Sequence, residues 1–234
     1  MVILPLVKKE LKHYFFSPVA YVVICIFLII TGWFFSNALF LTKESELRGM
    51  LDIMPLLLTF FIPAITMKAL SEERKSDTLQ LILTLPVKDW EVIFSKYVAS
   101  VVLYAVMLCF TLFYVFLLKI IGRPDSGVLT ASYIGLLLLG SSYISIGIFA
   151  SSLTRSQVIA FIIGFAIMFL FFVISRLKML FPAGLQSLIS SFSVIDHFDN
   201  LLRGVVSLDD LVYFLLLNMV FLFFATYQIQ RDRK

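Results

Sequence analysis

Charged residues are scarce in this chain, at 15% of 234 residues, whereas they average about 25% in soluble domains. Hydrophobic residues make up 61% of the sequence and include 25 Phe. The long apolar runs are continuous, so the alternation of apolar and polar residues that a membrane β-barrel requires is also missing. These absences exclude a soluble globular domain and a strand barrel.

Cysteine and histidine are equally rare, with two of each. Cys25 and Cys109 fall inside apolar runs, and we expect them to be small buried residues without a disulfide or metal. His13 and His197 are expected on opposite sides of a membrane, so they cannot share a site. No catalytic set, metal-ligand cluster or GxxxxGK[ST] phosphate loop is present in the sequence. The chain is predicted not to be an enzyme.

Ionisable residues are missing from the middle of the apolar runs. An ion-driven carrier needs such groups to bind its coupling ion, and each costs about 2.5–3.5 kcal/mol or more to bury in a bilayer. The polar exceptions, Asn37 and Asn218, are neutral amides that are expected to hydrogen-bond between helices. Energy for any transport is therefore expected to come from outside this chain.

Six apolar runs approach the roughly 20 residues that a helix needs to cross about 30 Å of hydrocarbon. They cover residues 19–41, 51–67, 92–118, 132–153, 158–174 and 211–227. The sequence therefore predicts an all-α membrane protein with six transmembrane helices in a single domain, residues 1–234. Small residues at Gly140, Gly147, Ser151 and Thr154 share one face of the fourth run, which favours close helix packing inside the chain. Dimer contact and pathway lining remain alternatives for this face.

The orientation follows from the basic residues that flank the runs. With the N-terminus inside, twelve Lys and Arg fall on the cytoplasmic side and seven on the other. Both termini and residues 68–96 are therefore predicted to be cytoplasmic. The net charge of +4 then reflects topology and requires no nucleic-acid partner.

Residues 1–16 have the pattern of an interfacial helix on the lipid bilayer. One side is apolar and the other charged: Leu4, Val7, Leu11 and Phe15, against Lys8, Lys9, Glu10 and Lys12. Ser17 and Pro18 suit the N-cap and first position of the first span. The alternative is a plain basic flank that only sets topology.

Residues 175–210, between the last two spans, are too apolar for a solvated loop and are interrupted at Pro182 and Gly184. A short helix is predicted to begin near Asp196 and to end at Arg203-Gly204, because Gly commonly follows a helix end. The segment is expected to form short re-entrant helices on the outer side.

Ten charged residues concentrate in residues 67–96. Ser71 is expected to cap one short helix, and Thr78 a second one that runs to Leu85 and ends at Pro86. Within the second helix Leu79, Ile82 and Leu83 form an apolar face. Such a face could rest on the lipid surface or fit a groove on a cytoplasmic partner, and composition does not separate the two.

The order of these residues resembles the signature loop of ABC-2 type transporter permeases. The matching pieces are Glu72-Glu73-Arg74-Lys75, Thr78-Leu79, residues 81–87, Trp90-Glu91 and Lys96-Tyr97. The sequence departs from the family pattern at Asp77, where Gly is usual, at Gln80, where Glu is usual, and at Ser95. Residues 62–67 resemble the gliding-motility-associated branch, and His197-Phe198 with Arg203-Gly204 resembles the family's outer segment.

The resemblance implies a bacterial inner-membrane permease half that pairs with an identical or related half and with two separate ABC ATPase subunits. ATP and Mg would bind the ATPase and not this chain. The helix from Thr78 to Leu85 would be the coupling helix that touches the ATPase, with Glu72, Glu73 and Arg74 at its joint to the second span. ATP hydrolysis would then drive substrate export or mechanical work. The alternative is a non-transporting scaffold that transmits ATPase motion to an additional membrane protein with an outer domain.

Overall fold

The computed structural model describes residues 3–37, 39, 47–83, 87–122, 125–178, 182, 186 and 190–232, without the side chains of residues 81–83, 121 and 232. Regular secondary structure in these residues is entirely helical. Six of the described helices are long and apolar enough to cross a membrane, which confirms the predicted all-α architecture. They are α2 (Pro18–Asn37), α3 (Arg48–Thr66), α6 (Asp89–Ile121), α7 (Ser126–Ser152), α8 (Gln157–Leu177) and α11 (Leu208–Asp232).

Two of the spans begin several residues before their apolar runs, at polar residues that cap the helix or lie in its first turn. α6 begins at Asp89, as expected, and the Lys88 backbone N–H donates to Glu91 Oε2 at 3.0 Å. α7 begins six residues before its predicted start, because Asp125 caps it by accepting the Gly127 N–H at 2.8 Å. A criterion based on apolar runs misses such turns, since capping requires polar side chains.

Helix α3 passes through both of its prolines without ending. Pro55 lies in its third turn and Pro63 near its end, and the helix stops at Met67, whose N–H donates to Pro63 O at 2.8 Å. A shorter helix, α4 (Lys68–Lys75), follows directly. The change from α3 to α4 therefore comes about one turn after Pro63.

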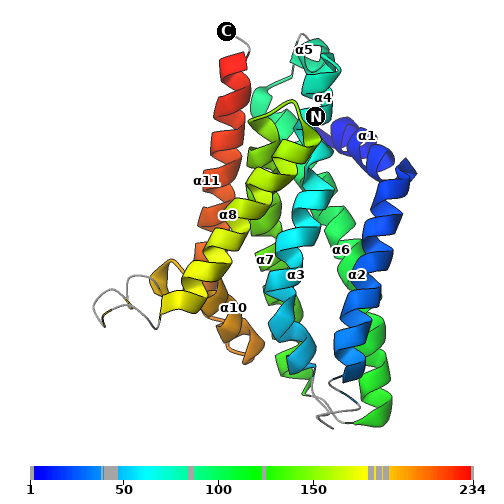
Figure 1. The fold of residues 1–234 in the computed structure, drawn as a ribbon, viewed down its shortest axis with the longest axis vertical. Helices are drawn as coiled ribbons and strands as arrows, with labels where there is room; N and C mark the ends of the chain where they lie inside the picture. Colours follow the sequence, from blue (N-terminus) through cyan, green and yellow to red (C-terminus); the bar gives the residue numbers. More distant parts are fainter. Residues whose placement is uncertain are drawn as a thin grey trace.

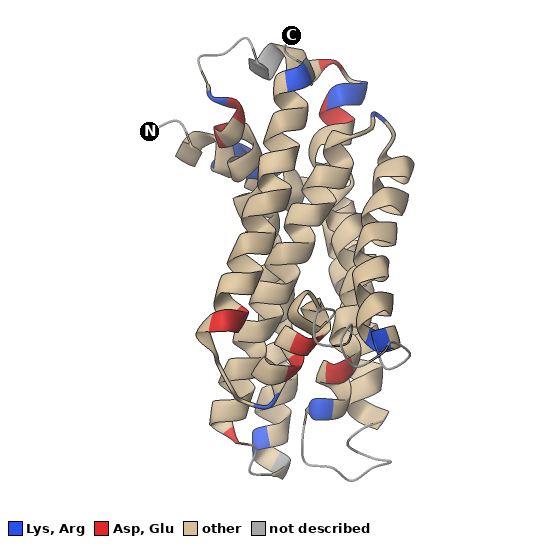
Figure 2. Cartoon of the chain, turned by 90° about the vertical axis from the view of Figure 1, so that its left-hand side faces the viewer, with Lys and Arg blue, Asp and Glu red and all other residues tan. Residues whose placement is uncertain are grey.

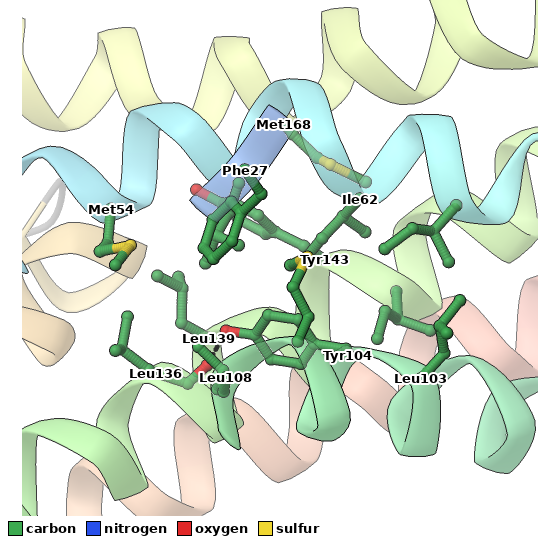
Figure 3. Close-up of a cluster of buried hydrophobic side chains, with 14 of the residues drawn as sticks. Phe27, Met54, Ile62, Leu103, Tyr104, Leu108, Leu136, Leu139, Tyr143 and Met168 are labelled. Atoms are coloured by element: carbon green, nitrogen blue, oxygen red, sulfur yellow. Dashed lines mark hydrogen bonds between the residues drawn. The ribbon is translucent and has the colours of Figure 1, made fainter. Parts of the chain in front are cut away.

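Helix α7 forms the centre of the bundle and contacts α3, α6, α8, α10 and α11. Of its membrane-spanning window 78% is buried, against 22% for α8 and α11. A Cβ atom on Gly140 would overlap the ring of Tyr104, and one on Gly147 would overlap Thr66. At this close contact between α6 and α7, the Tyr104 hydroxyl donates to Leu136 O at 2.8 Å (Figure 3). The small face therefore serves internal packing, the favoured interpretation.

Of the two amides that were expected to hydrogen-bond between helices, only one does so. Asn218 joins helices as predicted, because its amide donates to Ser142 Oγ at 3.1 Å and accepts from Tyr97 at 3.1 Å. Asn37 instead donates to Trp33 O in its own helix.

Cys25 and Cys109 are free thiols, but they are exposed on the surface of this single chain, and the prediction that they are buried is wrong.

The two ends of the bundle differ in what they present (Figure 1). α1 (Ile3–Phe16), α4, α5 (Thr78–Leu83) and the last turn of α11 gather at one end, which we call the α4–α5 end. α10 (Val194–Leu202) lies toward the other end. Charged residues lie mainly toward these ends, and the middle of the bundle is largely without them (Figure 2). This distribution suits a chain whose central part faces hydrocarbon.

Helix α1 forms as predicted, but its faces are arranged differently. It packs mainly on α6, and its buried residues are Glu10 and Tyr14. Lys8 and Lys9 are exposed as expected, whereas the placement of Glu10 on the solvated side is wrong. Leu11 and Phe15 pack half-buried against the core, and Leu4 is exposed. The difference arises because Glu10 pairs with a lysine inside the bundle.

Candidate functional site

Helices α4 and α5 project from the α4–α5 end and meet at a tight turn. Ser76 ends α4 by donating its hydroxyl to Glu72 O at 2.9 Å, and it also hydrogen-bonds Thr78 Oγ1 at 2.8 Å. Asp77, between them, has φ of 55°, in the left-handed region that most L-residues avoid and Asp tolerates. The turn fixes the direction in which α5 leaves α4.

Helix α4 is held to the bundle by a serine of α7. Ser151 Oγ accepts the N–H groups of Leu70 and Ser71, each at 3.0 Å, and donates to Met67 O at 3.1 Å. These N–H groups belong to the first turn of α4, where no intrahelical acceptor exists. Ser71 is not the N-cap that the sequence suggested; it lies inside the helix, and its hydroxyl donates to Met67 O. The cap comes from a helix about 80 residues further along the chain.

A buried ion cluster joins three helices below α4. Lys96 of α6 is 1% exposed, and its Nζ lies 2.8 Å from Glu73 Oε1 on α4 and 3.2 Å from Glu10 Oε1 on α1. Lys9 approaches the same Glu73 oxygen at 3.8 Å from the exposed side. Because a buried charge is tolerated only when it is paired, this cluster fixes α1, α4 and α6 relative to one another. We call Glu10, Glu73 and Lys96 the buried triad.

Tyr14 supports the buried triad one helical turn away. Its hydroxyl hydrogen-bonds Ser100 Oγ at 2.9 Å, and burial raises the pKa of Tyr14 to about 12. Sequence reasoning placed Lys96 in the cytoplasmic flank and missed this cluster. The sequence does carry one indication of the cluster. Lys96 and Ser100 are four residues apart, so they are two polar positions on one face of an otherwise apolar helix.

The described part of α5 exposes polar side chains. Leu79 is only 4% exposed and packs against the chain's own core, so it does not contribute to an outward apolar face. Asp77, Thr78 and Gln80 are exposed. The side chains of Ile82 and Leu83, and all of Leu85 and Pro86, lie outside the described residues. Of the three leucine and isoleucine positions in that predicted face, the structure thus describes the side chain of only one, Leu79, which is buried.

The outer residues singled out from the sequence lie at the opposite end and do not join the α4–α5 site. α10 begins at Val194, capped by Ser193, and ends before Gly204, whose φ is 81°. His197 Nδ1 lies 2.6 Å from Asp210 Oδ1, and its ring stacks on Tyr213 with 4.1 Å between centroids. The helix therefore ends as predicted but begins two residues before Asp196, and it is clamped to the start of α11.

Other members of the outer segment have separate positions. Phe198 is fully buried and packs close to Gly135 on α7, while Arg203 is exposed. Among the described residues there is no group of three or more His, Cys, Asp or Glu that could hold a metal ion. α10 packs against α7, α8 and α11 toward this end of the helix bundle.

Residues 7–232 match the family described as ABC-2 family transporter protein, which is nearly the whole chain. The chain belongs to this family. No curated protein matches the sequence. Membership makes the chain a permease subunit of an ABC transporter and a multi-pass membrane protein, and it implies an ABC ATPase as a partner.

Asp77 is one position at which the sequence departs from the ABC-2 signature loop, and its backbone conformation explains why the turn is kept. The resemblance to the signature loop implies a glycine at the position of Asp77, and Asp77 has the left-handed backbone that glycine adopts without strain. Asp is among the few residues that also enter this region. The substitution therefore preserves the turn between α4 and α5 in this ABC-2 permease.

Proposed function

We propose that this chain is the permease subunit of an ATP-driven ABC-2 transporter, in which α4 and α5 pass the motion of a separate ATPase to the membrane helices. The α4–α5 end then faces the cytoplasm of a bacterial inner membrane, with both termini on that side. Two ATPase subunits bind ATP and Mg, and a second permease half, identical or related, completes the membrane part.

The observation that supports the proposal most directly is the double attachment of α4. On one side Ser151 of α7 holds its first turn, and on the other Glu73 joins it to Lys96 of α6 and, through Lys96, to Glu10 of α1. A movement of α5 is thus transmitted through α4 to α7, the most buried helix of the bundle, and to α6 and α1. A segment that only rested on lipid would need neither attachment.

The exposed turn formed by Asp77, Thr78 and Gln80 is the surface we assign to the ATPase in this proposal, together with the described backbone of α5. Glu72, Glu73 and Arg74 form the joint that passes the load inward. Leu79 acts from inside, by anchoring α5 to the core.

A cross-linking experiment tests the contact. Cys25 and Cys109, the only cysteines, are replaced, and Gln80→Cys is labelled with a photoactivatable cross-linker in the complex with the co-purified ATPase. The matched control is Thr130→Cys, which is also exposed but belongs to the first turns of α7, toward the other end. A cross-link to the ATPase from position 80 and none from 130 is expected. Equal labelling from both, or none from position 80 in an intact complex, contradicts the assignment.

A second measurement in the same complex tests transmission. Glu73→Gln is expected to keep the cross-link at position 80 while lowering the change in ATP hydrolysis that the permease imposes on the ATPase. Unchanged hydrolysis would refute the role of Glu73. A complex that hydrolyses ATP under permease control, yet moves no solute or lipid in vesicles, would favour the scaffold function with an outer-domain partner.

A further inference from the structure

A cavity of about 300 Å³ lies at the α4–α5 end, lined by residues of α1, α2, α3, α4, α5 and α6. The lining has an apolar part and a charged part. The membrane-spanning helices contribute apolar side chains, among them Val23, Ala64 and Leu103. α1 and α4, which lie at the end of the bundle (Figure 1), contribute most of the charged side chains, and Lys96 of α6 adds one. The volume lies at the lower end of the roughly 300–1,000 Å³ range of small-ligand sites.

The charged part of the lining is balanced between the two signs. It consists of Lys9, Lys68, Lys96, Glu10, Glu72 and Glu73. Lys96 is committed to the buried triad, and Lys9 lies within 4 Å of both Glu10 and Glu73. Lys68 and Glu72 make no ion pair or side-chain hydrogen bond with the described residues. A cation and an anion thus remain available in the same cavity.

The carboxylates also present acceptors that the described protein does not satisfy. Glu72 Oε2 and Glu73 Oε2 are both buried and have no hydrogen-bond partner among the described residues. A buried charged acceptor without a donor is costly, more so than a neutral one. The two oxygens come from adjacent residues of α4, at the wall of one cavity. Together they require a ligand group with several N–H donors and a positive charge.

We propose that this cavity binds an aminoethyl phosphate group, carried by a membrane phospholipid, with its ammonium at Glu72 and Glu73 and its phosphate at Lys68. A primary ammonium offers three donors, enough for both orphan oxygens. The glycerol and the start of an acyl chain lie along the apolar wall. The position at the end of a membrane-spanning bundle is the depth at which headgroups occur. The proposal does not depend on coupling to an ATPase.

The same contacts disfavour related ligands. A quaternary trimethylammonium group has no N–H to donate, so it leaves both carboxylate oxygens unsatisfied. An anionic headgroup without an amine meets the same two carboxylates with no cation between them. Selectivity for a primary amine over a trimethylated amine is therefore the distinguishing property of this site.

Lipid retention by the full chain tests the proposal. The purified protein, exchanged into nanodiscs that hold equal amounts of phosphatidylethanolamine, phosphatidylcholine and phosphatidylglycerol, is released and its bound lipid is counted by native mass spectrometry. We expect one retained phosphatidylethanolamine, preferred over phosphatidylcholine by roughly tenfold or more, as loss of charge-assisted hydrogen bonds predicts. Equal retention of the two lipids overturns the proposal.

Two pairs of variants locate the binding. Glu72→Gln is expected to reduce the preference at least severalfold, whereas Asp52→Asn, which removes an exposed carboxylate outside the cavity, leaves it unchanged. Lys68→Gln is expected to weaken retention, whereas Lys75→Gln, exposed on the same helix, is not. Neither Glu72 nor Lys68 has a side-chain partner to lose among the described residues, so we expect the fold, checked by thermal unfolding, to be kept. Unchanged retention in Glu72→Gln refutes the site.

The source of the headgroup is tested with free phosphoethanolamine. The lipid's acyl chain and glycerol add contacts with the apolar wall, so the soluble compound is expected to compete only weakly. If free phosphoethanolamine binds as tightly as the lipid in a competition measurement, the membrane origin of the ligand is wrong.

Discussion

Removing the buried cation should destabilise the chain far more than removing the exposed one beside it. Lys96 and Lys9 approach the same Glu73 Oε1 atom, at 2.8 and 3.8 Å, and they differ mainly in burial, since their side chains are 2% and 57% exposed. Met retains most of the length of a lysine side chain without its charge. Lys96→Met and Lys9→Met are therefore a matched pair in which the lost charges face the same carboxylates but differ in burial and distance.

The magnitudes follow from that difference. Lys96→Met leaves the carboxylates of Glu10 and Glu73 without their buried counter-charge, and breaking a buried pair costs about 3–5 kcal/mol. Lys9→Met removes a screened surface contact, for which about 0–1 kcal/mol is usual. At roughly 2–4 °C per kcal/mol for a chain of this size, the unfolding temperature should fall by about 6–20 °C for the first variant and by less than about 4 °C for the second.

Thermal unfolding of the detergent-purified protein, followed by helical circular dichroism, measures both shifts. A triple variant, Glu10→Gln with Glu73→Gln and Lys96→Met, provides the internal check. Because it removes the uncompensated charges together, it should recover most of the stability that Lys96→Met loses. Equal shifts for the two lysine variants, or a triple variant less stable than Lys96→Met, would show that the buried triad does not act through charge pairing.

Three further predictions concern packing, capping and ionisation. Gly140→Ala should destabilise the chain, because its Cβ would overlap the Tyr104 ring, whereas Gly164→Ala, with its nearest contact at 3.5 Å, should leave the unfolding temperature nearly unchanged. Ser151→Ala should cost about 1–3 kcal/mol and speed amide hydrogen exchange in the first turn of α4, where two N–H groups lose their acceptor. Burial raises the pKa of Tyr14 to about 12, while the unfolded value is about 10, so stability should fall as pH rises from about 10 to about 12. Tyr14→Phe should show a smaller fall in pH-dependent unfolding, and a fall of the same size in the variant would assign it to other groups.

Local patterns predicted the helices well, because each depends on residues close in sequence. The six apolar runs, the start of the first span at Pro18 and the end of α10 at Gly204 needed only length, composition and terminal residues. Errors arose where the deciding partner was distant. Serine is a residue type that commonly caps helices, and Ser71 was expected to do so, yet Ser151 on another helix caps α4. Cys25 and Cys109 lie within spans, but which side of a span is buried depends on its neighbours.

The sequence alone predicts a six-span helical membrane protein, because crossing a bilayer requires continuous apolar helices, which can be recognised from any local stretch of residues. Its signature loop also indicated the ABC-2 family. The roles of the charged residues, in contrast, depend on how the helices pack. Glu10 and Lys96 look like ordinary polar flanks in sequence, and they become a buried pair 86 residues apart because α1 packs on α6. Charge pairing is set by distance and burial, and neither exists until the helices have packed.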